Sequence, residues 1–182
     1  MSIKVQRLFA YFSYFEPNFI DCELLNELFP HDDDDLQKSL DYLERRGLIE
    51  LEERDESVGY AITHRCLQKE MGHFYHGQGR ESSEQILKRI AGCLAKRVEI
   101  PCNRHVRKNR RIDLDFKQVK YVVTQLETNK KLRDLLTELN EKLGYFYLFY
   151  EINYRKALDC FEQVSEVMQE QRYGKCFSKN FF

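Results

Sequence analysis

The sequence predicts a mainly α-helical protein with one small β-hairpin, and three observations carry this prediction. Apolar residues recur at intervals of three and four over most of the chain, as they do in amphipathic helices. Two short segments between residues 48 and 63 instead alternate with period two, which is typical of strands. The 182 residues are 42% hydrophobic and include 13 Phe and 11 Tyr, enough for one or two small cores.

Two helices are predicted within the first thirty residues. Apolar residues at helical spacing predict a helix over residues 3–15, which ends before Pro17. The stretch IDCELLNELFP predicts a short second helix, with Asp21 as its N-cap and Pro30 beyond its end.

A third helix is predicted over DDDDLQKSLDYLERRG, where three leucines share one face. Its acidic residues fall in the first turn and two arginines in the last, which suits the helix dipole, and Gly47 follows as the stop. We therefore interpret the acidic run as a capped helix start rather than a metal site.

The next segments predict a β-hairpin and a fourth helix. LIELEE and VGYAIT alternate with period two around the polar turn RDES, and helical spacing resumes at His64. Three helices followed by a strand pair predict a winged helix. Duplex DNA is an unfavourable partner for it, because residues 32–47 carry six acids against three bases and ELEERDE carries five against one.

Charge divides the chain into two parts. Residues 1–79 carry 8 Lys/Arg against 16 Asp/Glu, whereas residues 80–182 carry 21 against 14. The balance changes from -8 to +7 near the Gly- and Ser-containing stretch HGQGRESSEQ. We expect a winged-helix domain over residues 1–79, a helical linker region over 80–128 and a third unit over 129–182, and we expect the opposite charges to attract.

The linker region combines helices with a basic loop. SSEQILKRIAGCLAKRV predicts a helix with Ser82 or Ser83 as N-cap, and FKQVKYVVTQLETN and KKLRDLLTELNEKLG predict two more. The loop CNRHVRKNRR could bind RNA, an anionic membrane or the acidic hairpin or third helix, although a solvated loop is the commoner explanation. Its candidate protein-binding residues are Arg107, Lys108, Arg110 and Arg111.

The segment LGYFYLFYEINYRKALDCFEQVSEVMQE resembles one tetratricopeptide repeat (TPR). The resemblance rests on Leu143, Gly144, Tyr147, Tyr154, Ala157 and Phe161. The connection between its two helices is one residue longer than usual, and no proline closes it. A single repeat cannot bury its own face, so the resemblance implies protein partners, with Tyr147 and Tyr154 as candidate contacts. An ordinary helical bundle is the alternative.

Residues 1–76 resemble the winged-helix domain of STAND-class signalling ATPases, the NB-ARC and NACHT-type proteins. The most specific part is the run Ile62–Gln68, ITHRCLQ, after the second strand of the hairpin. In that family a histidine at this position contacts the β-phosphate of bound ADP, so the resemblance implies this role for His64. The usual Met and Asp of the motif are Thr63 and Arg65 here. The alternative is that His64 only caps its helix or packs against the hairpin.

The nucleotide-binding domain of that family is not in this sequence. None of the eight glycines begins the phosphate-binding pattern GxxxxGK[ST], so ADP or ATP would require such a domain in cis or in trans. We expect a non-enzymatic regulatory and scaffold portion of a STAND-type sensor, as a fragment, a split gene product or a truncated relative. The alternative is a winged-helix regulator that binds nucleic acid with its basic second half.

The composition indicates where in the cell the protein is expected. The six cysteines form no CxxC pair and no complete metal-ligand set, which favours free thiols in a reducing cytoplasm. No apolar run approaches the roughly 20 residues that a membrane span needs, and the first residues lack the pattern of a signal peptide. We therefore expect a cytoplasmic protein without a membrane span.

Overall fold

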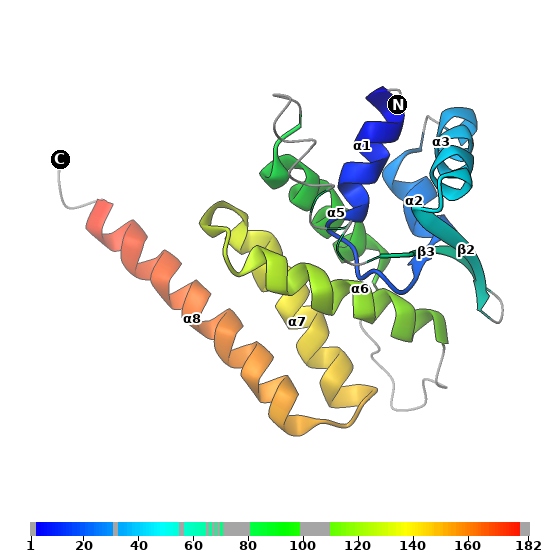
Figure 1. The fold of residues 1–182 in the computed structure, drawn as a ribbon. Helices are drawn as coiled ribbons and strands as arrows, with labels where there is room; N and C mark the ends of the chain where they lie inside the picture. The colour runs from blue at the N-terminus through cyan, green and yellow to red at the C-terminus, as the bar shows by residue number, and fades with distance from the viewer. Residues whose placement is uncertain are drawn as a thin grey trace.

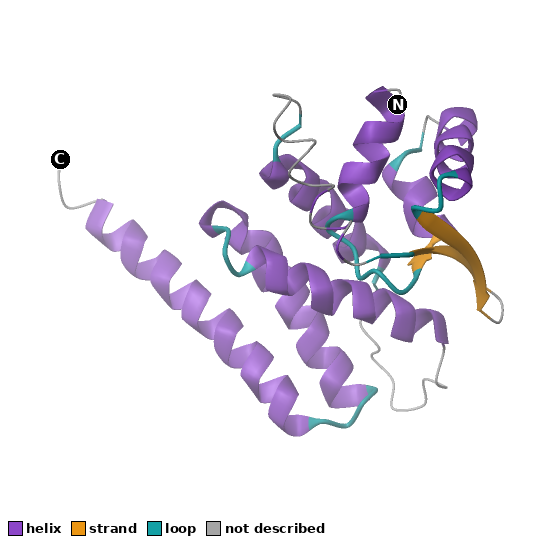
Figure 2. Ribbon diagram, viewed as in Figure 1, coloured by secondary structure: helices purple, strands orange, loops and turns teal. Residues whose placement is uncertain are grey.

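The protein is mainly helical with a small antiparallel sheet at one side, which confirms the predicted fold class (Figures 1 and 2). The computed structural model describes residues 3–30, 33–54, 57–64, 66, 68, 70, 81–98 and 110–178. Within these residues the elements follow in the order α1 (Ile3–Phe12), β1 (Ile20–Asp21), α2 (Cys22–Leu28), α3 (Asp33–Arg45), β2 (Ile49–Arg54), β3 (Ser57–Ile62), α5 (Ser83–Arg97), α6 (Arg110–Leu126), the 3₁₀ helix η1 (Lys130–Leu132), α7 (Arg133–Phe149) and α8 (Tyr154–Ser178).

The local signals for helix ends are confirmed in the first half. Asp21 is the N-cap of α2, where its side chain accepts a hydrogen bond of 3.2 Å from the backbone N–H of Glu23. Gly47 follows α3 with a φ of 64°, a left-handed conformation that glycine adopts without steric cost. The first helix is shorter than predicted: it ends at Phe12, and a turn at Ser13 and Tyr14 follows directly.

The sheet has three strands in the order β1-β3-β2, and the two-residue strand β1 was not predicted from the sequence. The strand β3 is central, and its residues from Gly59 to Ile62 are all buried, so both of its faces are covered there instead of one. A side chain at Gly59 would collide with the backbone oxygen of Ile20 and the ring of Phe19, each at 2.6 Å. Leu51 of β2 is 43% exposed, so the predicted alternation does not give β2 a fully buried face.

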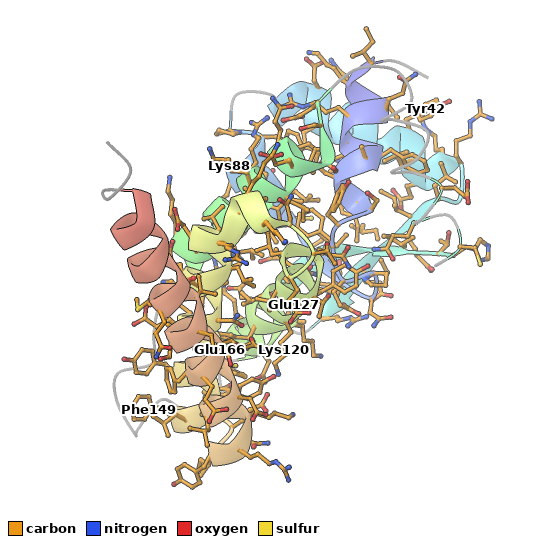
Figure 3. The ribbon with its side chains drawn as sticks, turned by 90° about the vertical axis from the view of Figure 1, so that its left-hand side faces the viewer. Tyr42, Lys88, Lys120, Glu127, Phe149 and Glu166 are labelled. Carbon is orange, nitrogen blue, oxygen red and sulfur yellow. The ribbon has the colours of Figure 1, made fainter. Side chains whose placement is uncertain are left out.

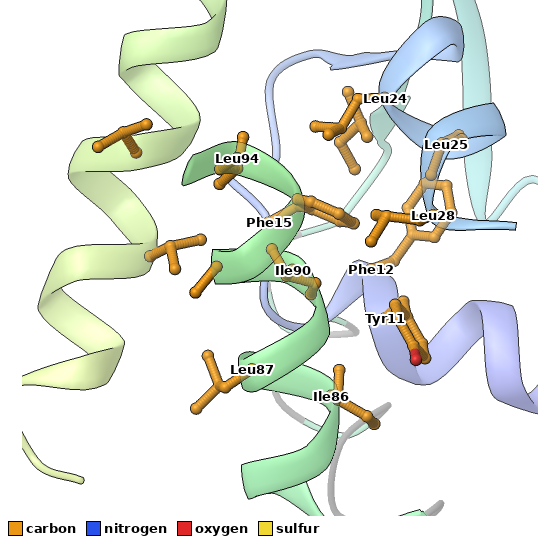
Figure 4. Packing of buried hydrophobic residues seen from close by; sticks show 14 of the residues in the cluster. Tyr11, Phe12, Phe15, Leu24, Leu25, Leu28, Ile86, Leu87, Ile90 and Leu94 are labelled. Atoms are coloured by element: carbon orange, nitrogen blue, oxygen red, sulfur yellow. The ribbon is translucent and has the colours of Figure 1, made fainter. Parts of the chain in front are cut away.

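One continuous cluster of buried side chains runs through both predicted halves of the chain. In Figure 4, Phe12 and Phe15 lie beside the leucines of α2, and Ile86 and Ile90 of α5 face them from the other side. The burial of each large apolar side chain contributes roughly 1.5–3 kcal/mol, so this contact provides much of the stability of the fold.

Helix α5 is fixed at its start by two sets of polar contacts. Ser82 and Gln85 form a capping box, which confirms Ser82 as the N-cap. The neighbouring Glu81 accepts hydrogen bonds of 3.1 Å from both Arg7 and Tyr11 of α1. Burial and the charge of Glu81 raise the pKa of Tyr11 to about 12, so its hydroxyl remains a donor at neutral pH.

Helix α6 begins earlier than the sequence suggested. Arg110 and Arg111 were predicted to lie in the basic loop, but they form the first turn of α6. The reason is that Ile112 is four residues before the buried Phe116, so the apolar stripe of the helix already starts there.

Helices α7 and α8 form a hairpin in which the backbones approach closely. An added Cβ at Gly144 of α7 would lie 2.8 Å from the ring of Phe161 in α8, and the same ring meets Tyr145 edge-on at 5.2 Å. Ala157 of α8 is 2% exposed. Small residues at these positions therefore permit the contact between the two helices, as the sequence predicted.

No helix within the described ranges has both the length and the apolar character that crossing a membrane requires.

The first prediction compares two helical glycines. Gly144→Ala should destabilise the protein by about 1–2 kcal/mol, because the new methyl group must displace the ring of Phe161. Gly92→Ala in α5 is the control: its Cβ meets nothing within 4 Å, and alanine favours the helix by about 0.5–1 kcal/mol. Urea unfolding monitored by circular dichroism measures both changes. Equal effects at the two positions would contradict the proposed close contact.

Candidate functional site

The strand–helix junction at His64 is the site that the sequence singles out. His64 comes two residues after the end of β3, its side chain is exposed, and the described residues Cys66, Gln68 and Glu70 that follow it are helical. The predicted junction is therefore present, with its histidine at the surface.

The backbone on both sides of His64 is fixed by hydrogen bonds. On the strand side, the hydroxyl of Thr63 donates to the carbonyl oxygen of Gly47 at 2.7 Å. On the helix side, the amide of Gln68, which is 6% exposed, donates to the carbonyl oxygens of Phe12, at 3.3 Å, and Phe15. The glutamine of the ITHRCLQ run thus ties its helix to the end of α1, a structural role that sequence reasoning had not assigned to it.

Residues from four different parts of the chain donate hydrogen bonds to the segment of residues 15–19, which lies between α1 and β1. Gln68 is one of them. Gln118 of α6, which is 3% exposed, donates to the carbonyl oxygens of Phe19 at 2.7 Å and Glu16 at 3.2 Å. Its side-chain oxygen also accepts a hydrogen bond of 2.9 Å from the N–H of Glu16. The N–H of Ile62 donates to Pro17 at 2.8 Å, and Arg54 donates to the carbonyl oxygen of Asn18, also at 2.8 Å.

A groove opens between the 15–19 segment, the end of β2 and the outer side of α6. Its volume is about 670 Å³, and it is lined by Glu16, Asn18, Phe19, Arg54, Leu114, Lys117, Lys120, Tyr121 and Thr124. We call it the α6 groove. Sequence reasoning did not find it, because its walls come from segments about 100 residues apart.

Two of the three basic side chains of the α6 groove have acidic partners. Arg54 pairs with Glu52 at 2.5 Å, and its guanidinium lies 4.8 Å from the ring centre of Phe19. Lys120 pairs with Glu151 at 2.7 Å. Lys117 is exposed and forms no ion pair or hydrogen bond within the described part of the chain.

The buried guanidinium of Arg97 joins the acidic and basic halves of the chain. Its side chain, in the last turn of α5, is 3% exposed and donates to Asp115 of α6 at 2.8 Å and to Glu27 of α2 at 2.6 Å. It also pairs with Asp21, the N-cap of α2. Burial alone would lower the pKa of Arg97, but these carboxylates outweigh burial and raise it. Burial raises the pKa of Asp115, and the charge of Arg97 acts in the opposite direction.

The predicted basic cluster is described only in part. Arg107 and Lys108 lie outside the described residues, and Arg110 is the first residue of α6. Arg111 pairs with Glu23 of α2. At Arg111, therefore, the basic segment contacts the acidic half at α2, and the contact of this segment with the hairpin or the third helix stays a prediction.

The two predicted tyrosine contacts differ in their accessibility. Tyr147 is 8% exposed, with the ammonium group of Lys120 at 4.8 Å and that of Lys156 at 5.2 Å from its ring centre. Tyr154 is 67% exposed at the start of α8. The first turn of α8, which begins at Tyr154, lies well apart from the strands β2 and β3 in Figure 1.

Comparisons of this chain with protein-family models, with curated proteins and with solved structures find no match. Among the described residues, no three His, Cys, Asp or Glu side chains are grouped so that they could hold a metal ion. Two candidate sites follow from the geometry of the described residues: the exposed imidazole of His64 beside a helix, and the α6 groove with basic and aromatic side chains in its walls.

The second prediction concerns Arg97. Arg97→Met should destabilise the protein by about 3–5 kcal/mol at neutral pH, because it leaves buried carboxylates without their cation. The control is the same change at Lys96, the preceding and exposed residue, which should cost less than about 0.5 kcal/mol. Urea unfolding of the whole chain measures both.

The effect of Arg97→Met should also depend on pH. A carboxyl whose pKa is raised by folding contributes stability when protonated and loses it as the pH rises past the raised pKa. Asp115 is such a group, and without Arg97 its pKa should rise further. The difference in the free energy of unfolding between the parent chain and Arg97→Met should therefore shrink as the pH falls from neutral towards that raised pKa. A difference that is constant with pH would contradict this role of Asp115.

Proposed function

We propose that this chain is a non-enzymatic regulatory and scaffold protein, the winged-helix and TPR-like portion of a STAND-type sensor. It would act through contacts with other proteins, among them a nucleotide-binding domain in cis or in trans. The observation that carries the proposal is the exposed His64 at a junction whose flanking backbone is fixed by Thr63 and Gln68.

The order of elements in the first half supports a winged helix. Three helices, a short strand after the first of them and a final strand pair follow in the order α1, β1, α2, α3, β2 and β3. The sheet has the order β1-β3-β2, and the hairpin β2–β3 extends away from the helices, as a wing would (Figure 2).

Charge favours a protein partner over DNA for this half. Glu44 of α3 and Glu50 and Glu53 of β2 are exposed on the two elements that a winged helix would use to approach DNA. Phosphates would be repelled from these carboxylates, whereas a partner domain with basic residues would be attracted.

The α7–α8 hairpin supports the TPR-like part of the proposal. The close approach of Gly144 and Phe161 and the buried Ala157 are the contacts expected within one repeat. Leu158 and Met168 of α8 are each more than 50% exposed, so one side of this helix is available for a partner.

His64 would serve as a contact to ADP that a partner domain holds. An exposed imidazole can donate a hydrogen bond to a phosphate, and the free N–H groups of a helix start favour negative charge nearby. Such a contact would stabilise only the closed arrangement of the two domains, which is how a bound nucleotide can bias an equilibrium.

The third prediction tests this role. The chain is produced together with a nucleotide-binding domain, either on the same polypeptide or as a separate partner protein. The affinity of this assembly for ADP is then measured by calorimetry. His64→Ala should weaken ADP binding by about tenfold to a hundredfold, the equivalent of a lost hydrogen bond to a charged group of roughly 1.5–3 kcal/mol. The chain alone should not bind ADP.

Two further variants separate this role from a structural one. Cys66→Ala, two residues further on and also exposed, should leave ADP affinity unchanged. Gln68→Ala should lower the stability of the chain, because it removes the bonds to Phe12 and Phe15. If His64→Ala instead unfolds the chain and leaves the ADP affinity of the assembly intact, the histidine is only a cap.

The fourth prediction concerns duplex DNA. The whole chain should show no saturable binding to duplex DNA at micromolar concentration in fluorescence anisotropy at physiological salt. Replacing Glu44, Glu50 and Glu53 together by Gln should increase weak binding, because three repulsive charges are removed from the surface. Tight binding by the unmodified chain, with a binding constant whose logarithm falls linearly with the logarithm of the salt concentration, would favour the nucleic-acid alternative.

A further inference from the structure

The lining of the α6 groove extends along several turns of α6, a length that suits a short extended chain. Leu114, Lys117, Tyr121 and Thr124 line the groove from successive turns of α6. At 1.5 Å per residue these turns cover about 15 Å. An extended peptide rises about 3.3 Å per residue, so four or five residues would fill this length. The opposite wall is the 15–19 segment with Arg54.

This groove is formed before any ligand arrives. Gln118 makes three hydrogen bonds to the 15–19 segment from the buried side of α6. Phe19 is 3% exposed and packs so closely on Gly59 that a side chain there would collide with it. A ligand would therefore not have to order these walls, which lowers the entropic cost of binding.

Charge narrows the class of ligand. Arg54 and Lys120 are already neutralised by Glu52 and Glu151, and Glu16 adds another carboxylate to the wall. Lys117 remains as a cation that, within the described residues, has no acidic partner. One available cation among several acids suits a single carboxylate and is unfavourable for a polyphosphate chain, which needs several.

The rest of the lining combines the apolar or aromatic Phe19, Leu114 and Tyr121 with the uncharged polar Asn18 and Thr124. Leu114 and Tyr121 lie one turn before and one turn after Lys117 on α6, and the exposed Thr124 is the last residue of α6 in the lining. We propose that the α6 groove binds a short extended segment of a partner protein that carries one Asp or Glu beside large apolar side chains. The carboxylate would pair with Lys117 and the apolar side chains would pack on Leu114 and Tyr121.

The experiment selects short random peptides from a display library on the immobilised full-length chain and measures the enriched peptides by fluorescence anisotropy. An acidic residue next to apolar residues should be enriched. Lys117→Glu should weaken binding about tenfold or more, because an attraction becomes a repulsion of similar size. Exchange of the acidic residue of the peptide for Lys should restore binding to this variant.

Matched controls separate the groove from general charge and from misfolding. Lys88→Glu makes the same change at an exposed position of α5, well apart from Lys120 of the groove in Figure 3, and should leave affinity within about twofold. Thr124→Trp should block the groove. Thr128→Trp should not, although both threonines are exposed and donate from their hydroxyl to the carbonyl oxygen three residues earlier. Circular dichroism should show the same melting temperature for all four variants as for the parent chain.

Three results would overturn the proposal. One is the enrichment of no peptide, and another is the enrichment of peptides whose affinity is equal in Lys117→Glu and Lys88→Glu. The third is tighter binding of a single-stranded oligothymidylate, lost in Lys117→Glu, which would make the groove a nucleic-acid site. The groove involves neither His64 nor ADP, so the failure of this proposal and that of the proposed function are distinguishable.

Discussion

The segment of residues 15–19 is the constraint on which the arrangement of the molecule depends. It carries five consecutive backbone carbonyl groups, and each accepts a hydrogen bond from another element: Gln68, Gln118, Ile62 and Arg54 supply the donors. A buried carbonyl without a donor would cost about 1–3 kcal/mol. The helix after His64, the central strand β3, the strand β2 and helix α6 are therefore all positioned against the same short piece of backbone.

Arg97 positions the two halves of the chain in a different way. Removing a guanidinium from water is costly, and the attraction of Asp21, Glu27 and Asp115 repays that cost only when their geometry is good. Such a cluster contributes more to orientation than to net stability, which comes mainly from the apolar contact of α5 with α1 and α2. Each buried polar side-chain atom in the described part of the chain has a hydrogen-bond partner, so no buried polar group offsets the stability that the apolar contacts provide.

The features that could be predicted from the sequence are those fixed by neighbouring residues. Asp21, Gly47 and Ser82 mark helix ends because caps act within one turn of the helix. The helices α2, α3, α5 and α7 are identified by the spacing of their apolar residues, which is also a local property of the sequence. The strand-to-helix junction at His64 was also predicted locally, from the alternating segment before it, whereas the role of His64 rests on the resemblance alone.

What could not be predicted depends on contacts between distant residues. Gln118 meets Glu16 across 102 positions, and Arg97 meets Asp21 across 76, so no spacing rule connects them. A single signal was available: Asp115 and Gln118 are polar residues three apart, beside the apolar stripe of α6. Strand β1 was missed because two residues carry no periodicity, and it exists only because β3 pairs with it through Ile20 and Tyr60.

The segment of residues 15–19 connects the two candidate sites, His64 and the α6 groove. Gln68 follows His64 and bonds Phe15, whereas Gln118 supports the α6 groove and bonds Phe19, four residues further on. A ligand that moved one end of this segment would have to strain or break bonds at the other, because the carbonyls between them are held by Ile62 and Arg54. The rigid segment favours two contacts held in one fixed relative position over two that open and close independently. That property suits a scaffold, whose partners must be presented to each other in a constant geometry, and it requires no catalytic group.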